Sequence, residues 1–447
     1  MTSSWVRFLP PAIKRRVEGR AQFQKILGNI SWLSLDRLVR MGVGLIVGVW
    51  VARYLGRDQF GTLNFAAAFV FLFSPLAVLG LDSIVIRDLV GRPEKGYETL
   101  GTAFWLKLLG GLVSALTAFV LILVTRPGES LYHTLVVIAA AGVLFQSLDV
   151  IDFWFQSQVR AKYVVYARNG AFLLMSAMRV VLILLQAPLV AFAWAAFAEL
   201  GVAAVGLVFL YRQQGQRLVE WRGGIERAKS LLRDGWPLFL SGVSIAIYMR
   251  IDQVMIGYML NDSAVGIYSA AIRLVEIWYF LPMAIGASVL PALIRVREED
   301  ELFYTRKLQT FYDVMGGLSL VIAAVMSILS TPIIAILYGQ KFEGAGPILA
   351  VYAWAAVPVF LGAASSQHFI VQNLTRVTLY RTFAGLVTNV CLNFVLIPIL
   401  GPLGATVASL VSQTVVAFSI AMIPGTGRQA SMLLAALNPF KTIRHLR

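Results

Sequence analysis

Long apolar segments joined by short loops constrain this chain more than any other feature of its sequence. Each segment has roughly the 20 residues that a helix needs to cross a bilayer. The segments begin near Ile30, Phe60, Leu100, Leu131, Tyr163, Leu189, Gly235, Val265, Leu308, Gly346, Val377 and Leu403. This pattern predicts an all-α integral membrane protein with twelve transmembrane helices and little structure outside the membrane, which excludes most enzyme classes.

The positions of the positive charges predict the topology. Of the 38 Lys and Arg residues, 28 lie in the two tails or in loops on one side of the predicted helices, and four lie in the opposite loops. Cytoplasmic loops of membrane proteins carry the excess of Lys and Arg, so both termini are expected in the cytoplasm. The net charge of +15 is then mostly a consequence of topology, and no nucleic-acid partner is expected.

A polar linker near the middle of the chain leaves six predicted helices on each side. The expected parts are a cytoplasmic basic segment at 1–28, an N-terminal six-helix bundle at 29–212, a cytoplasmic linker at 213–233, a C-terminal six-helix bundle at 234–424 and a cytoplasmic tail at 425–447.

The two halves carry signs of an internal repeat. The segment VARYLGRDQFGTLNFAAA aligns with IGYMLNDSAVGIYSAAIR, so that Gly61 falls over Gly266 and Ala66 over Ala271, each 205 positions apart. Because both halves start from the cytoplasm, they are expected to form parallel bundles related by a pseudo-two-fold axis along the membrane normal. Such bundles usually surround a transport site that opens alternately to either side. Channels and scaffolds also arise by duplication, and they remain alternatives here.

Charged residues inside the predicted helices are candidates for the functional site. An ionisable group at the bilayer centre costs about 2.5–3.5 kcal/mol on insertion scales, so such groups usually face a cavity or a partner. The candidate cations are Arg37, Arg40, Lys107, Arg179, Arg250 and Arg273. The acids that are candidates for ion coupling or charge pairing are Asp36, Glu199, Asp252 and Glu276.

Helical spacing limits which of these charges face the same way. Arg273 and Glu276 are three positions apart and share a helix face, as do Asp36 and Arg40 at a spacing of four. Arg250 and Asp252 are two apart and point about 160° from each other, so they do not line the same cavity.

Two explanations remain open for these charges. One is that the charges form structural ion pairs between helices. The other is that the cations bind an anionic passenger. The cations that lack an acid on their own helix face favour the passenger, and a diphosphate suits them because guanidinium binds phosphate oxygens in a bidentate way. The three His residues are scattered and Cys391 is the only cysteine, so neither a metal site nor an intrachain disulfide is expected. No catalytic residue is expected.

Three segments resemble a known family. They are the stretch from Asp252 to Pro291 (DQVMIGYMLNDSAVGIYSAAIRLVEIWYFLPMAIGASVLP), its counterpart VARYLGRDQFGTLNFA in the first half, and DFWFQSQVRAKYVVYAR at residues 152–168. Together, and over nearly the whole chain, they resemble the polysaccharide-transporter branch of the multidrug/oligosaccharidyl-lipid/polysaccharide exporter superfamily.

This resemblance implies a V-shaped pair of six-helix bundles with a cationic inner cavity. It implies a flippase that moves a polyprenyl-diphosphate-linked oligosaccharide to the periplasmic leaflet of the bacterial cytoplasmic (inner) membrane, for O-antigen, capsule or exopolysaccharide assembly. Arg37 and Arg273 are the first positions to carry over. Membrane lipids and polysaccharide polymerase or assembly proteins are the implied partners. No cofactor is implied, and the sequence does not choose between a proton, a sodium ion and the membrane potential as the driving force.

Features of the sequence disfavour three other functions. Lipid II flippases of the superfamily usually have fourteen helices, whereas residues 425–447 contain only the short apolar run MLLAAL. Multidrug exporters of the superfamily extrude cations, which the six intramembrane cations disfavour. A membrane glycosyltransferase or polymerase needs a large polar loop, and the predicted external loops are short.

Overall fold

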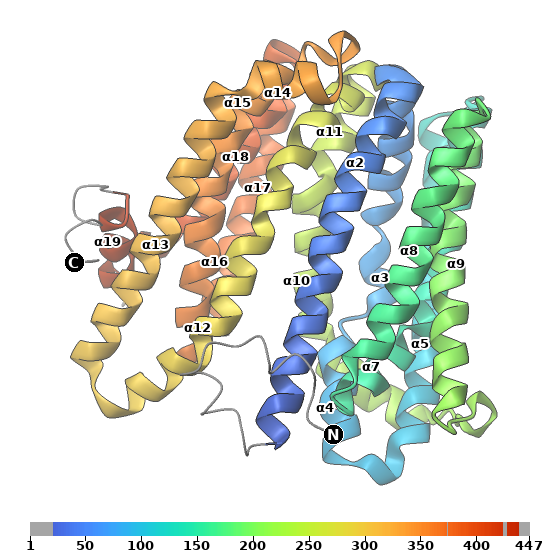
Figure 1. Ribbon diagram of the computed structural model, residues 1–447, viewed down its shortest axis with the longest axis vertical. Coiled ribbons are helices and arrows are strands. Elements are labelled where there is room, and N and C mark those ends of the chain that lie inside the picture. Colours follow the sequence, from blue (N-terminus) through green and yellow to red (C-terminus); the bar gives the residue numbers. More distant parts are fainter. Residues whose placement is uncertain (1–20, 373, 423–426, 438–447) are drawn as a thin grey trace.

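A computed structural model describes residues 21–372, 374–422 and 427–437, and these residues are helical with no strand among them (Figure 1). The helices are α2 (Ala21–Phe71), α3 (Ser74–Val78), α4 (Asp82–Gly91), α5 (Gly96–Thr125), α6 (Ser130–Val143), α7 (Val150–Ser157), α8 (Ala161–Leu184), α9 (Leu189–Gln213), α10 (Ile225–Met259), α11 (Asp262–Glu276), α12 (Phe280–Glu299), α13 (Glu301–Ile328), α14 (Ser330–Leu337), α15 (Ala345–Tyr352), α16 (Ala356–Val371), α17 (Thr375–Leu400), α18 (Pro402–Phe418) and α19 (Gly427–Ala435).

The described residues contain eleven helical stretches that are long and apolar enough to cross a membrane. Ten of them coincide with separate apolar segments of the sequence. The first, Val39–Phe71, contains the end of the segment that begins near Ile30 and the start of the one that begins near Phe60. The membrane fold is therefore confirmed, while the count of twelve crossings stays a prediction.

The chain reverses direction inside α2. Gly56 has φ +71° and ψ 174°, a backbone conformation that interrupts the helix and that glycine adopts without a steric penalty. Residues 44–51 and 60–67 line the same cavity, although a straight helix would separate residues 44 and 67 by about 35 Å. The two limbs of α2 thus lie side by side as a helical hairpin.

Local sequence explains where other helices begin and end. The Asn261 side chain accepts a hydrogen bond from the Ala264 amide at 2.9 Å and caps the start of α11. The Asp300 carboxylate does the same for α13 through the amides of Leu302 and Phe303. Gly401, with φ +60°, ends α17 and is followed by Pro402 at the first turn of α18.

The helices gather in two groups with α2, α10 and α11 between them (Figure 1). Helices α5, α6, α8 and α9 pack on one another and on α2, while α13, α16, α17 and α18 form the other group. The C-terminal segment at 425–447 contributes α19, which packs on α13; residues 425–426 and 438–447 of that segment, like residues 1–20 of the N-terminal segment, lie outside the described residues.

The repeat-related glycines lie where the second limb of α2 meets the start of α11. A Cβ on Gly61 would lie 1.8 Å from the carbonyl oxygen of Asp262, and a Cβ on Gly266 would lie 2.0 Å from that of Arg57. Arg57 and Asp262 are themselves related by the same offset of 205, so each half offers the same contact to the other. Reciprocal contacts of this kind occur only around a two-fold axis, which here passes between the second limb of α2 and α11.

The two groups do not divide cleanly at the linker predicted for 213–233. Helix α10 begins at Ile225, inside that segment, and its first turns pack on α3, α4 and α5 of the first half. Its last turns pack on α11 and α17 of the second half. Since α10 also contains Pro237, which donates no backbone hydrogen bond, the helix has a weak point between its two attachments.

Candidate functional site

Two adjoining cavities lie where the halves meet. One, of about 370 Å³, is lined by α2, α8, α9 and α11, and the other, of about 340 Å³, by α2, α10 and α11. Arg273, Asn64 and Ala67 line both cavities. We call the two together the central cavity. Its charged lining residues are Arg179, Glu199, Arg250, Arg273 and Glu276.

Arg273 occupies the boundary between the two parts of the central cavity. Its Nη2 donates a hydrogen bond to the Gly44 carbonyl oxygen at 3.3 Å, and it forms no ion pair with any residue that the structure describes. Gly48 makes room for it, because a Cβ there would lie 2.7 Å from the Arg273 Cζ. A guanidinium from the second half therefore lies in a groove of α2, and no carboxylate among the described residues forms an ion pair with it.

An ion pair from the first half lies on one side of Arg273. Arg179 on α8 donates to the Glu199 carboxylate on α9 at 2.8 Å. Arg40 on α2 approaches the other Glu199 oxygen at 3.9 Å and lies over the Phe172 ring, with its Cζ 5.1 Å from the ring centroid. The glutamate is thus shared by two arginines.

A looser ion pair from the second half lies on the other side. Arg250 on α10 reaches the two Glu276 oxygens on α11 at 3.4 and 3.5 Å. The sequence placed Glu276 on the same helix face as Arg273, and the structure pairs it with Arg250 instead. The central cavity therefore has three arginines and two glutamates among its described lining residues, and its formal charge is positive.

Asp252 does not line the central cavity, whereas Arg250 does; the sequence predicted that the two face different ways but not which one faces the cavity. Asp252 is buried in the second half and accepts hydrogen bonds from Tyr268 Oη at 2.8 Å, from Asn393 Nδ2 at 2.6 Å and from Ser409 Oγ. Asn389 joins through its side-chain oxygen, which accepts from Asn393 at 3.1 Å. Sequence reasoning missed the two asparagines, although their spacing of four within one apolar helix is a detectable signal.

Lys107 is a predicted cation that the structure does not place at the central cavity. Lys107 on α5 is buried against Asp82, at 3.3 Å, and lies 4.9 Å from the centroid of the Phe153 ring; it lines neither part of the central cavity. The side chains of Asp36 and Arg37 lie outside the described residues.

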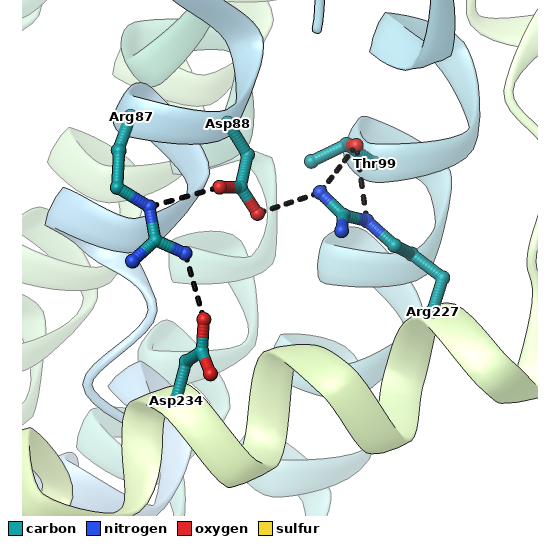
Figure 2. Close-up of polar contacts among 5 residues, drawn as sticks. All are labelled: Arg87, Asp88, Thr99, Arg227 and Asp234. Carbon is teal, nitrogen blue, oxygen red and sulfur yellow. Dashed lines mark hydrogen bonds and ion pairs between the residues drawn. The ribbon is translucent and has the colours of Figure 1, made fainter. Parts of the chain in front are cut away.

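A second polar cluster joins the start of α10 to the first half (Figure 2). Arg227 donates to Asp88 at 2.6 Å and to Thr99 at 3.3 and 3.1 Å. Arg87 donates to Asp88 at 2.9 Å and to Asp234 at 2.7 Å. These bonds to Asp234 and Asp88 raise the pKa of Arg87. We call these five residues the Arg87–Arg227 clamp. Its two arginines and two aspartates balance in charge.

The first half of the chain and the beginning of its second half match a known family. The family described as polysaccharide biosynthesis protein matches residues 26–297. The chain is 31% identical over 190 residues to the probable flippase AglR of Haloferax volcanii, an alignment that covers 41% of this chain and 39% of AglR. It is 26% identical over 98 residues to the lipopolysaccharide biosynthesis protein WzxC of Escherichia coli, covering 22% of this chain and 19% of WzxC. The chain thus spans less than half the length of either relative.

Solved structures show the same fold. The lipid II flippase MurJ in an inward closed conformation matches with a TM-score of 0.71 and 14% identity, over 92% of this chain and 95% of MurJ. An inward-facing multidrug resistance MATE family transporter of the MOP superfamily matches with a TM-score of 0.68 and 17% identity, over 90% and 98%. The predicted exporter fold is therefore confirmed, and at these identities the likeness speaks to the fold alone.

Proposed function

Because the chain belongs to the polysaccharide biosynthesis protein family, we propose that it is a flippase for polyprenyl-diphosphate-linked oligosaccharide. The passenger would cross from the cytoplasmic to the periplasmic leaflet of the bacterial inner membrane by alternating access, in O-antigen, capsule or exopolysaccharide assembly. Both termini would lie in the cytoplasm, and polymerase or assembly proteins would receive the product. No covalent step is needed.

Arg273 is the observation that supports this proposal most. Its guanidinium lies inside the molecule, between two cavities and without a carboxylate partner among the described residues. An uncompensated cation in such a place is costly unless an anion visits it. A diphosphate fits because its oxygens accept the parallel N–H groups of guanidinium.

The surplus of positive charge also separates this function from cation export. A multidrug exporter that extrudes cations needs acids to hold them, whereas both glutamates of the central cavity are already paired with arginines. The glycan would occupy the space between the two groups of helices, and the polyprenyl chain would stay in the lipid.

Asp252 is our candidate for ion coupling. A buried carboxylate that accepts from two hydroxyls and one side-chain amide suits either a proton or a sodium ion, since both neutralise its charge. Because α10 carries both Asp252 and Arg250, occupancy of this site would be transmitted to the central cavity through one helix. This provides a route by which an ion gradient would weaken phosphate binding in the outward-facing state.

The sidedness of lipid-linked oligosaccharide tests the proposal. In cells that lack the protein, we expect the intermediate to accumulate on the cytoplasmic leaflet, and we expect wild type but not Arg273→Ala to relieve this. Comparable amounts of the two proteins in the membrane are the control. Normal sidedness in the deletion strain, together with new sensitivity to cationic compounds, would contradict the flippase and support cation export.

A further inference from the structure

One part of the central cavity is rich in polar side chains that carry no charge. It is the part of about 340 Å³ lined by α2, α10 and α11, which we call the α10 part. Its uncharged polar residues are Asn64, Gln253 and Ser269. The other part, which α8 and α9 help to line, we call the α8 part; it has Ser176 and the shared Asn64 among mostly apolar side chains. The two parts therefore suit chemically different groups, although Arg273 lines both.

The Ser269 hydroxyl in the α10 part is buried and has no hydrogen-bond partner. The residue is 3% exposed on α11, and its Oγ forms no hydrogen bond with any residue that the structure describes. Many serine and threonine hydroxyls in these helices donate to a backbone carbonyl three or four positions earlier, as Ser244 does to Leu240 at 3.0 Å. Because an unpaired polar group is costly to bury, we expect Ser269 to find its partner in a ligand of the cavity.

Two carboxamides add donors and acceptors to the α10 part. Gln253 on α10 is buried, and its carboxamide forms no hydrogen bond with any described residue. It is three positions after Arg250, so both side chains lie on one face of α10, toward the cavity that both line. Asn64 on α2 donates through Nδ2 to the Phe60 carbonyl oxygen at 2.7 Å, which leaves its side-chain oxygen to accept. The α10 part thus offers one hydroxyl and two carboxamides to a ligand.

The ion pair of the α10 part is balanced, which disfavours a second phosphate there. Arg250 is held by Glu276 at 3.4 and 3.5 Å, so its charge is already neutralised. Hydroxyl and carboxamide groups beside a balanced ion pair suit a ligand that has several hydroxyls and no charge. A sugar has this chemistry. Phe71, which is exposed and lines the same part, provides the kind of apolar wall that ligand pockets combine with a few polar groups.

We propose that the α10 part of the central cavity binds the first sugar of the passenger, while Arg273 at its boundary binds the adjoining diphosphate. This inference rests on the proposed function and adds a specificity site to it. Ser269, Gln253 and Asn64 form hydrogen bonds with the sugar hydroxyls. A polyprenyl diphosphate without a sugar leaves these buried groups unpaired, and a site built to bind a hydroxyl discriminates strongly against a ligand that lacks it. The protein therefore selects the glycosylated passenger over the bare carrier.

Calorimetric titration of the purified full-length protein tests this assignment. The ligands are inorganic pyrophosphate and the 1-diphosphates of glucose, galactose and N-acetylglucosamine. We expect at least one sugar diphosphate to bind wild type about tenfold more tightly than pyrophosphate does. Ser269→Ala and Gln253→Leu should each weaken the binding of that sugar diphosphate about fivefold, because each removes hydrogen bonds to the sugar. Neither variant should change the affinity for pyrophosphate, which does not reach these groups.

Ser176→Ala is the matched control. Ser176 is as buried as Ser269, and its hydroxyl is likewise without a hydrogen-bond partner among the described residues, but it lines the α8 part. The substitution removes an identical group from the other part of the central cavity and should leave the preference for a sugar diphosphate unchanged. Thermal unfolding temperatures equal to that of wild type show that the variants are folded.

The outcomes distinguish this inference from the proposed function. If wild type binds neither pyrophosphate nor any sugar diphosphate, the diphosphate site fails, and the sugar site fails with it. If wild type binds all four ligands equally and Arg273→Gln binds none, the diphosphate site stands and the sugar site alone is overturned. Equal weakening of pyrophosphate and sugar diphosphate by Ser269→Ala would make this hydroxyl a phosphate ligand. Loss of the sugar preference in Ser176→Ala would place the sugar in the α8 part, and either result overturns the assignment.

Discussion

The Arg87–Arg227 clamp and the central cavity are built from the same residue types, but they differ in how well the charges are satisfied. In the clamp two arginines meet two aspartates through three short contacts of 2.6 to 2.9 Å, and Arg227 also donates to the Thr99 hydroxyl. In the central cavity three arginines meet two glutamates, one pair is stretched to 3.4 Å, and Arg273 forms no ion pair with a carboxylate that the structure describes. Balanced charges hold helices together, whereas surplus charges leave binding capacity for a ligand.

The clamp also shows which contacts the charged residues of the central cavity would make if they served only to hold helices together. Arg227 and Asp88 have side chains that are 8% and 14% exposed, and each has more than one partner. Charged side chains that are buried and have all their hydrogen-bond partners are typical of a fixed structural network. By this standard the explanation that the intramembrane charges merely pair off accounts for Lys107 with Asp82, but not for Arg273.

Arg227→Met should produce the largest effect on stability. It removes the more buried of the two arginines that contact the Asp88 carboxylate, and breaking a buried ion pair in this way costs about 3–5 kcal/mol. Chemical denaturation of the purified protein measures the change. The comparison between the two regions would fail if Arg227→Met unfolded at the wild-type denaturant concentration.

Gly48→Ala should impair transport while it leaves the fold intact. The added Cβ would lie 2.7 Å from the Arg273 Cζ, and the atom it meets is the end of a flexible side chain, which can move. We expect about tenfold slower flipping, about 1.4 kcal/mol, from displacement of the guanidinium. Gly42→Ala is the control on the same helix, because nothing lies within 4 Å of its Cβ. Equal rates for the two variants would remove Arg273 from the passenger site.

Arg250→Met should cost little stability, in contrast to Arg227→Met. Its contacts with Glu276 are 3.4 and 3.5 Å long, and the two side chains are 26% and 23% exposed beside a cavity, so water can replace the arginine. We expect a loss of about 1 kcal/mol in the same denaturation experiment. A loss as large as that of Arg227→Met would mean that the pair is structural after all.

The apolar pattern and local spacing were enough to predict the fold and some orientations. The apolar segments predicted the membrane helices, and the alignment of Gly61 with Gly266 indicated the internal repeat, although it did not predict that these residues meet across the two-fold axis. The two-residue spacing of Arg250 and Asp252 correctly placed them on different faces of α10, because that inference needs only the helical period. The predicted roles of Asp36 and Arg37 stay predictions.

Pairing between helices could not be read from the sequence. Glu199 is 20 positions from Arg179, and Asp252 is 141 positions from Asn393. Such partners depend on where helices cross and how each is rotated, which short-range spacing does not contain. The clamp was missed for a related reason. Arg87 and Arg227 were counted as loop charges that set topology, whereas the structure places them on α4 and α10 with acidic partners.

Arg87→Gln should have the smallest effect, although Arg87 belongs to the clamp. Its side chain is 60% exposed, and exposed ion pairs contribute only a few tenths of a kcal/mol to about 1 kcal/mol. Glutamine also retains a donor for Asp88, and Arg227 continues to neutralise that carboxylate. We expect a loss of about 0.5 kcal/mol and unchanged flipping. If Arg87→Gln were instead as destabilising as Arg227→Met, the link from Arg87 to Asp234 would hold α10 on the first half, and burial would not be what distinguishes the two regions.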